Sequence, residues 1–419
     1  MSLAKNRPNV KKAARRIRNS AGNESARAIF KYRDALRLPV VDADHLDDCL
    51  PASVFIEPPG KARRFMRRAP EFHDDPDGVG MFSGFTQDTI TYPPAFVATA
   101  RNARVVGFRT VLSENGFFFN DDSVIGPEER RLLLTQLAMP DPLNEETGLK
   151  PAGALGRFAL DPGDRTMQRV EGTAVLLSSA EPSNYGSWLF RVLPKLHTMA
   201  QINLCQPLRY LVWAGYPAFQ EYLRLLGISE HQIIHHDPTN IIYHLDQLIV
   251  PSIRNNTAFL DPESLTLFAR LRDELGGAQR PGTRIYVSRM LHSQRGSSSR
   301  VMLNEPELVE RLVGLDFSIV APETLSAPEQ ILTFSSAEMV VGPSGSGMFN
   351  VVFCHPGTKI IDIESEPHWI HAHLSLFASC GLRYGIFVGN AEDRDFREHH
   401  KPWKINIDAL ISRIASFLQ

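Results

Sequence analysis

A short glycine-rich segment is the first place in this sequence where binding chemistry can be expected. Gly342-Pro-Ser-Gly-Ser-Gly347 follows an apolar run and precedes a short helical stretch. Glycines let backbone N–H groups approach a ligand, and a helix N-terminus carries a partial positive charge, so this loop predicts a phosphate cradle. The residues that would line it are Ser344, Gly345, Ser346 and Gly347. It is not a Walker A loop, because no lysine follows the last glycine, and its GxxGxG order is not GxGxxG. A tight structural turn is the alternative.

Arginine side chains gather around an earlier predicted strand, Arg284–Ser288, and the polar loop after it. They are Arg284, Arg289, Arg295 and Arg300. In a parallel sheet, this loop and the glycine loop both leave the carboxyl ends of their strands, where ligands bind. Guanidinium groups would then meet a glycine-rich helix start and bind a pyrophosphate through bidentate contacts. A solvated basic loop is the alternative.

Glu364 ends the strand that is predicted after the glycine loop. Its carboxylate could accept two hydrogen bonds from ribose hydroxyls, and an exposed charge at a strand end is the alternative. Asp362 lies two residues earlier, so the two side chains should share one face. We interpret this pair as structural or ribose-binding, and we expect no metal site. The histidines lack the spacing and the carboxylate support of a metal site, and they are His235, His236, His368, His371 and His373.

A second cluster opens a predicted helix over 184–202. Asn184 is expected to cap this helix, and Trp188 falls at the spacing of its apolar, core-facing positions. Ser187 and Arg191 are four residues apart, so they should share one face near the helix start. Pro194 is expected to kink the helix because it lacks an N–H donor.

Strands and helices alternate from about residue 170, and the alternation restarts after 279–282. Strands alternating with helices predict parallel sheets with right-handed crossovers. Capping boxes are expected at Asn304 with Glu307 and at Ser326 with Glu329. We therefore predict an α/β protein with two Rossmann-like domains that face each other across a cleft, split near Gly282. The expected divisions are a basic tail (1–40), a strand-rich region (41–165), two Rossmann-like domains (166–280 and 281–390) and a C-terminal helix that packs back (391–419).

Length and composition limit the classes of protein to which this chain can belong. The chain has 419 residues and a formal net charge of −2, and about 150 residues per domain predicts two to three domains. A near-neutral chain is not a general nucleic-acid binder. Four scattered cysteines without a CxxC spacing indicate reduced thiols, and no apolar run reaches the roughly 18 residues of a spanning helix. We expect a cytoplasmic protein whose basic tail is solvated, with contact to an anionic membrane face as the alternative.

Taken in order, several pieces of the sequence resemble glycosyltransferase family 61 over roughly residues 95 to 390. They are Asn184-Tyr-Gly-Ser-Trp-Leu, Leu193-Pro-Lys-Leu196, Tyr286-Val-Ser-Arg289, Arg300, Asn304-Glu305, Glu329-Gln330, the loop 342–347 with Asn350 and Phe353, Pro356-Gly357-Thr358 and Gly381-Leu-Arg-Tyr384. The resemblance implies a GT-B-like fold, with 166–280 on the acceptor side and 281–390 binding the donor. It also implies inverting sugar transfer from a nucleotide sugar to a glycan or lipid-linked glycan, without a metal or other cofactor.

The resemblance assigns roles to the two clusters. Arg289 and Arg300 would stabilise the leaving diphosphate. The donor would also contact Arg295, Ser344, Gly345, Ser346, Gly347, Asn350 and Glu364. The acceptor side would be formed by Asn184, Ser187, Trp188 and Arg191. Bacterial relatives act in capsule or exopolysaccharide assembly, and the chain resembles these because it shows no membrane anchor.

Three positions depart from the family pattern. Many members have histidine at the positions of Ser187 and Ser344 and an acid at the position of Arg191, so the general base is not identified. Glu181 and the pair Asp121-Asp122 are candidates. The alternative hypothesis is therefore a sugar-nucleotide or glycan-binding module that has lost catalysis. A Rossmann oxidoreductase is disfavoured by the GxxGxG order.

Overall fold

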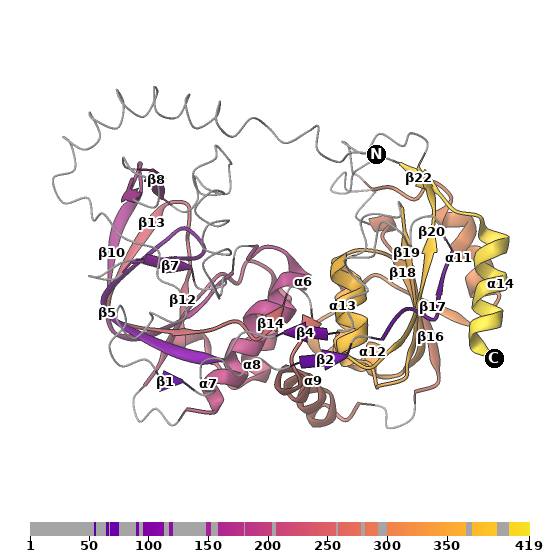
Figure 1. Cartoon of the computed structure of the whole chain (residues 1–419), viewed down its shortest axis with the longest axis horizontal. Coiled ribbons are helices and arrows are strands. Elements are labelled where there is room, and N and C mark those ends of the chain that lie inside the picture. Colours follow the sequence, from indigo (N-terminus) through magenta and orange to yellow (C-terminus); the bar gives the residue numbers. More distant parts are fainter. Residues whose placement is uncertain are drawn as a thin grey trace.

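The computed structural model of this chain shows a mixed α/β fold built on two main sheets, with helices between and outside them (Figure 1). It describes residues 54–55, 64–66, 68–74, 89–91, 95–112, 117–119, 148–151, 158–179, 181–202, 207–256, 259–277, 281–291, 300–365, 371–391 and 402–419. No helix in these ranges is long and apolar enough to cross a membrane.

The first sheet is mixed. Its strands, in spatial order, are β12 (Ile233–His235), β11 (Arg209–Val212), β10 (Thr166–Leu177), β13 (Ile241–Pro251), β5 (Phe96–Val106), β6 (Thr110–Leu112) and β7 (Phe117–Phe119), and β1 (Val54–Phe55) also pairs with β5. The first four run parallel, and the others are joined antiparallel. The order of the parallel part places β10 between strands that come later in the chain, as in a doubly wound fold.

The second sheet is parallel throughout. Its strands, in spatial order, are β17 (Phe317–Val320), β16 (Thr283–Val287), β18 (Ala337–Pro343), β19 (Lys359–Glu364), β20 (Arg383–Val388) and β3 (Phe72–His73). The chain turns first to β17 on one side of β16 and then to β18 on the other. The gap between the carboxyl ends of β16 and β18 is therefore the topological switch point, where ligands bind in such sheets.

Four short ladders and the helices complete the described elements. The ladders are β2 (Arg64–Met66) with β4 (Thr89–Thr91), β8 (Leu149–Pro151) with β9 (Phe158–Leu160), β14 (Asn255–Asn256) with β15 (Phe259–Leu260), and β21 (Asn390–Ala391) with β22 (Trp403–Lys404). The helical elements are α6 (Tyr185–Ser187), η3 (Trp188–Val192), α7 (Leu193–Ala200), α8 (Pro217–Leu225), η4 (Glu230–Gln232), α9 (Pro262–Glu274), α11 (Glu305–Val313), η5 (Pro322–Thr324), α12 (Ala327–Ser335), η6 (Ser346–Phe353), α13 (His371–Ser379) and α14 (Ile407–Leu418).

One apolar core joins the two sheets. It combines Leu177 and Val212 of the first sheet with Val340 and Ile360 of the second, and helices such as α7, α8, α12 and α13 fill the space between (Figure 1). Helices α11 and α14 cover the other face of the second sheet, in a separate core. Within the described residues, the two sheets are thus distinct, but helices pack tightly between them. A cleft between two separate domains stays a prediction.

Several described strands of the N-terminal part pair with strands of the two main sheets, whereas β2 with β4 and β8 with β9 form short ladders of their own. β5, β6 and β7 extend the first sheet, whereas β3 adds to the edge of the second. The segment before residue 165 therefore contributes strands to both sheets. Its sequence predicted short strands but held no signal for their partners, because strand pairing is a contact between distant segments.

Local signals correctly predicted two helix starts. Asn184 caps α6 by accepting a hydrogen bond from the Ser187 N–H at 3.1 Å, and Ser326 forms a capping box with Glu329. The expected box at Asn304 is wrong. The Asn304 amide instead pairs with the backbone of Ile405, donating to its carbonyl at 2.9 Å and accepting from its N–H at 3.2 Å. A tertiary contact with the C-terminal segment has thus replaced the local cap.

The helix that begins at Tyr185 accommodates Pro194 through a π-helical turn. In η3 the backbone N–H of Leu193 donates to the Trp188 carbonyl, five residues back, and α7 then begins with Pro194 in its first turn. Because proline lacks an N–H donor, Pro194 interrupts the helical hydrogen bonds at the point where the π turn passes into α7. Such π turns concentrate at functional sites.

A buried hydroxyl network crosses between the two sheets. The Tyr185 hydroxyl lies 2.6 Å from the side-chain carbonyl oxygens of both Gln330 and Asn350 and 2.9 Å from the Tyr222 hydroxyl. Burial raises the pKa of Tyr185 and of Tyr222, so both hydroxyls stay protonated and able to donate. The network therefore links α6 and α8 to α12 and η6 through neutral hydrogen bonds.

Tyr185→Phe should lower the free energy of unfolding by about 1–3 kcal/mol, because it leaves buried carbonyl oxygens short of a donor. Urea denaturation measures this change. Tyr210→Phe is the matched control, since the Tyr210 hydroxyl has no hydrogen-bond partner among the described residues and lies in the first sheet. An unchanged midpoint for Tyr185→Phe would show that the network contributes nothing to stability.

Candidate active site

The two segments predicted to bind phosphate meet at the switch point of the second sheet. Arg289 follows β16 and Ser344 follows β18, and a guanidinium nitrogen of Arg289 donates to the Ser344 carbonyl at 2.7 Å. A Cβ atom at Gly345 would collide with that guanidinium group. A larger residue at position 345 would therefore push the guanidinium group of Arg289 out of its present position against the loop.

Glu305 holds the strand end that carries Arg289. Its buried carboxylate accepts hydrogen bonds from the Arg289 backbone N–H at 2.8 Å, the Ser288 hydroxyl at 2.9 Å and the Tyr286 hydroxyl at 3.2 Å. Burial raises the pKa of Glu305, and these three donors act against that rise. Sequence reasoning gave Glu305 no role in the site. In the sequence, Glu305 is only an acidic residue in the first turn of a predicted helix, and acidic residues are common at any helix start.

Arg289 is a charged group in a confined place. Burial, and then the nearby charge of Arg300, lower its pKa to about 10, so it stays protonated at neutral pH. A poorly hydrated guanidinium group interacts more strongly with an anion than an exposed one does. The pair Arg289 and Arg300 is thus suited to hold a doubly charged group at the carboxyl edge of the sheet.

Asp362, Glu364 and His373 form a buried trio beside the glycine loop. The His373 Nδ1 atom lies 3.1 and 3.2 Å from the two carboxylate oxygens of Asp362 and 3.2 Å from the Ser344 hydroxyl. One ligand atom from each member of the trio lies within 4.8 Å of the others, so these residues could hold a metal ion. The expected shared face of Asp362 and Glu364 is confirmed. Sequence reasoning did not identify His373 as a neighbour of the glycine loop, because this residue reaches the site from α13.

Glu364 carries an unusual carboxyl group. Burial and then the charge of Asp362 raise its pKa well above the ordinary value, while Ser344, Arg300 and Arg289 act in the opposite direction. Neither of its oxygens has a hydrogen-bond partner among the described residues. A carboxyl group with a raised pKa next to cationic groups is a feature of functional sites.

A small cavity of about 10 Å³ lies at the end of Glu364. Its lining residues are Arg289, Arg300, Pro343, Ser344, Ile363, Glu364, Ser365 and Trp403. Trp403 belongs to β22 and comes from the C-terminal segment, which the sequence predicted only as a helix that packs back. α14 does pack on the second sheet, through Leu410, Ile414 and Phe417.

The glycine loop also meets the second predicted cluster. The Ser346 hydroxyl donates to the Asn184 side-chain oxygen at 3.3 Å, so the start of α6 and the start of η6 are neighbours. A Cβ atom at Gly186 would lie 2.7 Å from the Phe349 ring. The structure thus brings together two clusters that are more than 150 residues apart in the chain.

The other predicted residues of the second cluster are mostly interior. Trp188 is fully buried, stacks on Phe219 with ring centroids 4.3 Å apart, and donates from its indole nitrogen to the Trp213 carbonyl at 3.3 Å. Ser187 is buried, and Arg191 is half-buried with its guanidinium group 5.4 Å from the Phe190 ring centroid. The core position expected for Trp188 is confirmed, and contact of these residues with an acceptor stays a prediction.

The remaining predicted residues either lie outside the described residues or are buried. Arg295, the pair Asp121-Asp122 and the basic tail lie outside the described residues. Asn350 is fully buried, accepts a hydrogen bond from the Tyr185 hydroxyl and donates one to the Gly347 carbonyl, so it supports the glycine loop from the protein interior. His236 is enclosed by Phe108 and Tyr243, and burial lowers its pKa to about 4, which indicates a neutral structural histidine.

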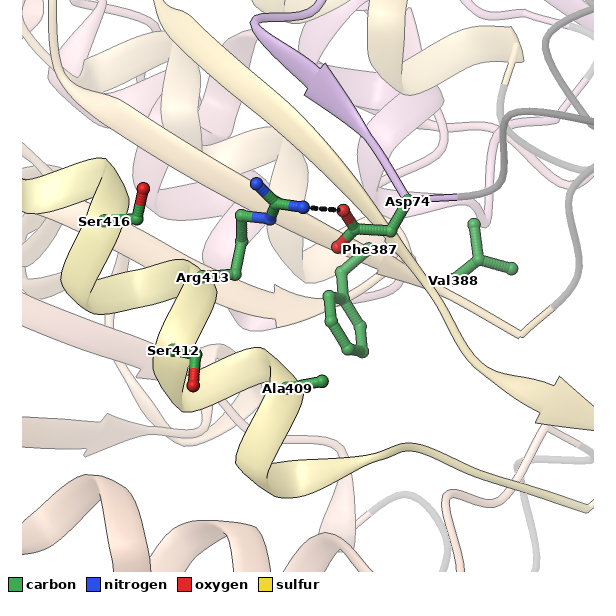
Figure 2. A pocket seen from close by; sticks show the side chains of 7 residues that line it. All are labelled: Asp74, Phe387, Val388, Ala409, Ser412, Arg413 and Ser416. Atoms are coloured by element: carbon green, nitrogen blue, oxygen red, sulfur yellow. Dashed lines mark hydrogen bonds and ion pairs between the residues drawn. The ribbon is translucent and has the colours of Figure 1, made fainter.

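A larger hollow of about 590 Å³ lies elsewhere, between α14 and the carboxyl ends of β20 and β3. Its lining residues are Asp74, Phe387, Val388, Ala409, Ser412, Arg413 and Ser416. Figure 2 shows Arg413 and Asp74 pointing toward each other in an ion pair at this hollow. Arg413 also lies over the Phe72 ring. Its cation thus already has partners, and the hollow contains no group with the features of the switch-point site.

The fold and the site together define an α/β protein in which an arginine and a glycine-rich loop meet at the switch point of a parallel sheet. Residues 185–361 match the family model of glycosyltransferase 61. The matched segment begins at α6 and ends within β19, so it includes Arg289, Glu305 and the glycine loop. The match supports this family and glycosyl transfer as the activity. No curated protein matches the chain.

Glu364→Gln should change the pH dependence of stability. Because the pKa of Glu364 is higher in the folded than in the unfolded chain, the folded state binds more protons between the two values, and stability falls as the pH rises. The variant lacks this loss, so it should be the more stable protein at pH 8 by more than about 1 kcal/mol, with the gap narrowing toward pH 5. Unfolding free energies of both proteins across this range measure the effect, and parallel profiles would contradict it.

Proposed function

We propose that this protein is a glycosyltransferase that uses a nucleotide-sugar donor, with the two sheets as the two lobes of a GT-B-like enzyme. The observation that carries the proposal is the contact of Arg289 with the Ser344 carbonyl at the switch point, inside the segment matched by the family. Cationic side chains beside a glycine-rich loop offer the charge and the N–H donors that a diphosphate needs.

The proposed role of Arg289 and Arg300 is to stabilise the leaving diphosphate. Negative charge grows on the leaving group as the donor bond breaks, so these cations gain strength toward the transition state. The backbone of Ser344–Gly347 would bind the same phosphates. The two arginines supply the charge that a divalent cation supplies in other transferases, and we therefore propose a metal-independent, inverting reaction.

The acceptor would bind on the side of α6. Asn184 contacts Ser346 across the two lobes, so an acceptor held by Asn184 and Arg191 would lie next to the donor loop, whereas Ser187 is buried and is not available to it. We propose a glycan or lipid-linked glycan acceptor in capsule, exopolysaccharide or related assembly, with the reaction in the cytoplasm at the inner membrane face. The support for this acceptor class is the resemblance of the sequence to bacterial members of the family.

Incubation with a panel of labelled nucleotide sugars and glycan acceptors tests the activity. We expect release of a nucleoside diphosphate that is unchanged in excess chelator, because arginines provide the positive charge. Binding of a donor without turnover would indicate the binding module instead. Loss of turnover in chelator, restored by manganese, would contradict metal independence and would point to Asp362, Glu364 and His373 as ligands.

Arg289→Ala should weaken nucleoside diphosphate binding by about tenfold or more, since it removes a hydrogen bond to a charged group. Arg289→Lys should restore only part of this, because an ammonium group cannot make the planar two-bond contact. Calorimetric titration measures both variants, with melting temperature as the folding control. Wild-type affinity in Arg289→Ala would mean that the phosphates bind elsewhere, and unfolding would show that Arg289 is structural.

A further inference from the structure

Two aromatic side chains form a corner at the carboxyl end of strand β11. Trp213 directly follows this strand and is half-buried, and Tyr216 directly precedes α8 and is 48% exposed. Their rings meet edge to face, with centroids 5.5 Å apart and an angle of 80° between the ring planes. Aromatic residues are enriched at binding surfaces because a partner that covers them buries a large area. We call Trp213 and Tyr216 the aromatic corner.

The core beneath the aromatic corner holds both of its rings in place. Each ring packs edge-on against the buried Phe219, with centroid distances of 6.0 Å from Trp213 and 5.3 Å from Tyr216. The Trp213 carbonyl also accepts a hydrogen bond from the Trp188 indole at 3.3 Å. A Cβ atom at Gly215 would lie 2.5 Å from the Trp213 ring, so this ring lies close against the backbone of its own loop. Packing thus fixes the orientation of both rings, as a binding surface requires.

The aromatic corner also presents polar groups that can bind a ligand. The Trp213 indole N–H and the Tyr216 hydroxyl have no hydrogen-bond partner among the described residues, and neither of these atoms is enclosed. An indole N–H only donates, whereas a phenolic hydroxyl donates and accepts. Apolar ring faces beside such groups match a molecule that has one apolar face and a rim of hydroxyl groups. The pyranose ring of a sugar has this form, because C–H groups make one of its faces apolar while its hydroxyl groups point outward.

The aromatic corner is continuous with the start of α6. Strands β10 and β11 are parallel neighbours, so the segments that follow them leave the same edge of the first sheet. The Tyr185 ring stacks on the Phe219 ring with centroids 6.0 Å apart, and Phe219 carries the aromatic corner. Asn184, next to Tyr185, contacts Ser346 of the glycine loop. The aromatic corner is therefore farther from the glycine loop than Asn184 is, because it is reached from the loop through Asn184, Tyr185 and Phe219.

We propose that the aromatic corner binds a sugar ring of the acceptor other than the ring that reacts. The reacting sugar lies near Asn184, next to the glycine loop, and a neighbouring sugar of the same glycan stacks on the aromatic corner and accepts from the Trp213 indole N–H. The inference rests on the proposed function and adds that the acceptor has at least two sugar units. An enzyme with such a site extends an existing glycan in preference to a single sugar.

Titrations with oligosaccharides of increasing length test the inference. Glucose, galactose, mannose and xylose oligosaccharides of one to four units are screened against the wild type, and the tightest ligand is compared with its own monosaccharide by calorimetry. We expect lengthening to raise the affinity by about tenfold or more, because exposed aromatic anchors contribute strongly to binding. In Tyr216→Ala and in Trp213→Leu this gain should fall to about threefold or less. Tyr216→Phe should keep most of the gain, because the ring remains.

The gain in affinity is an internal control, because both ligands are measured on the same variant and any loss of folded protein cancels. Met167→Ala is the matched control variant. Met167 is 59% exposed and lies in β10 of the same sheet, so this substitution removes an exposed apolar side chain without touching the aromatic corner. It should keep the full gain. Uridine, guanosine and adenosine diphosphates are titrated into the wild type in parallel, to test the donor site separately.

The outcomes separate this inference from the proposed function. If oligosaccharides bind but the gain is unchanged in Tyr216→Ala and in Trp213→Leu, the inference is wrong while the proposed function stands. If no oligosaccharide binds while a nucleoside diphosphate does, the inference is again wrong and the donor proposal stands. If neither class of ligand binds, both proposals are wrong. Binding to phosphatidylglycerol vesicles that depends on Tyr216 and Trp213, without a gain from oligosaccharide length, would overturn the inference and assign the aromatic corner to a lipid surface.

Discussion

The close packing of Phe349 against Gly186 is the contact on which the geometry of the site depends. Phe349 lies in η6, directly after the glycine loop of the second sheet, and Gly186 lies in α6, which follows β10 of the first. Because any side chain at Gly186 would meet the ring, the two elements approach as closely as backbone and ring allow. That approach places Asn184 within hydrogen-bonding distance of Ser346 and aligns the predicted donor and acceptor clusters.

The surroundings of this contact are buried and consist of apolar side chains and neutral polar groups. A hydroxyl and amide network around Tyr185 crosses it, and an apolar core continues from one sheet to the other. Close-packed interiors have low compressibility and transmit strain from one element to the next. The glycine loop and the start of α6 are therefore held next to each other at the junction of the two sheets by packing and by hydrogen bonds.

Charges are concentrated at the edge of the second sheet and are balanced there. Arg289 and Arg300 are close to the carboxylates of Glu305 and Glu364, and Asp362 is paired with His373. An uncompensated buried charge is costly, so removing one charged side chain of this cluster would shift the pKa values of its neighbours. Burial raises the pKa of both Glu305 and Glu364, but Glu305 accepts three hydrogen bonds, so Glu364 is the carboxyl group of this cluster that is the less well stabilised as an anion.

The sequence by itself determined the elements and the chemistry of the loops. Strand and helix alternation, the caps at Asn184 and Ser326, the parallel second sheet and the meeting of Arg289 with the glycine loop follow from periodicity, from capping chemistry and from the rule that ligands bind at carboxyl strand ends. Tertiary structure decided the rest. The Asn304 amide binds Ile405 instead of capping its helix, Trp403 and His373 enter the site from distant segments, and β3 joins the second sheet. These contacts depend on which distant segments become neighbours, and local sequence carries almost no signal for that, because packing and strand pairing gain their energy only when the whole chain has folded.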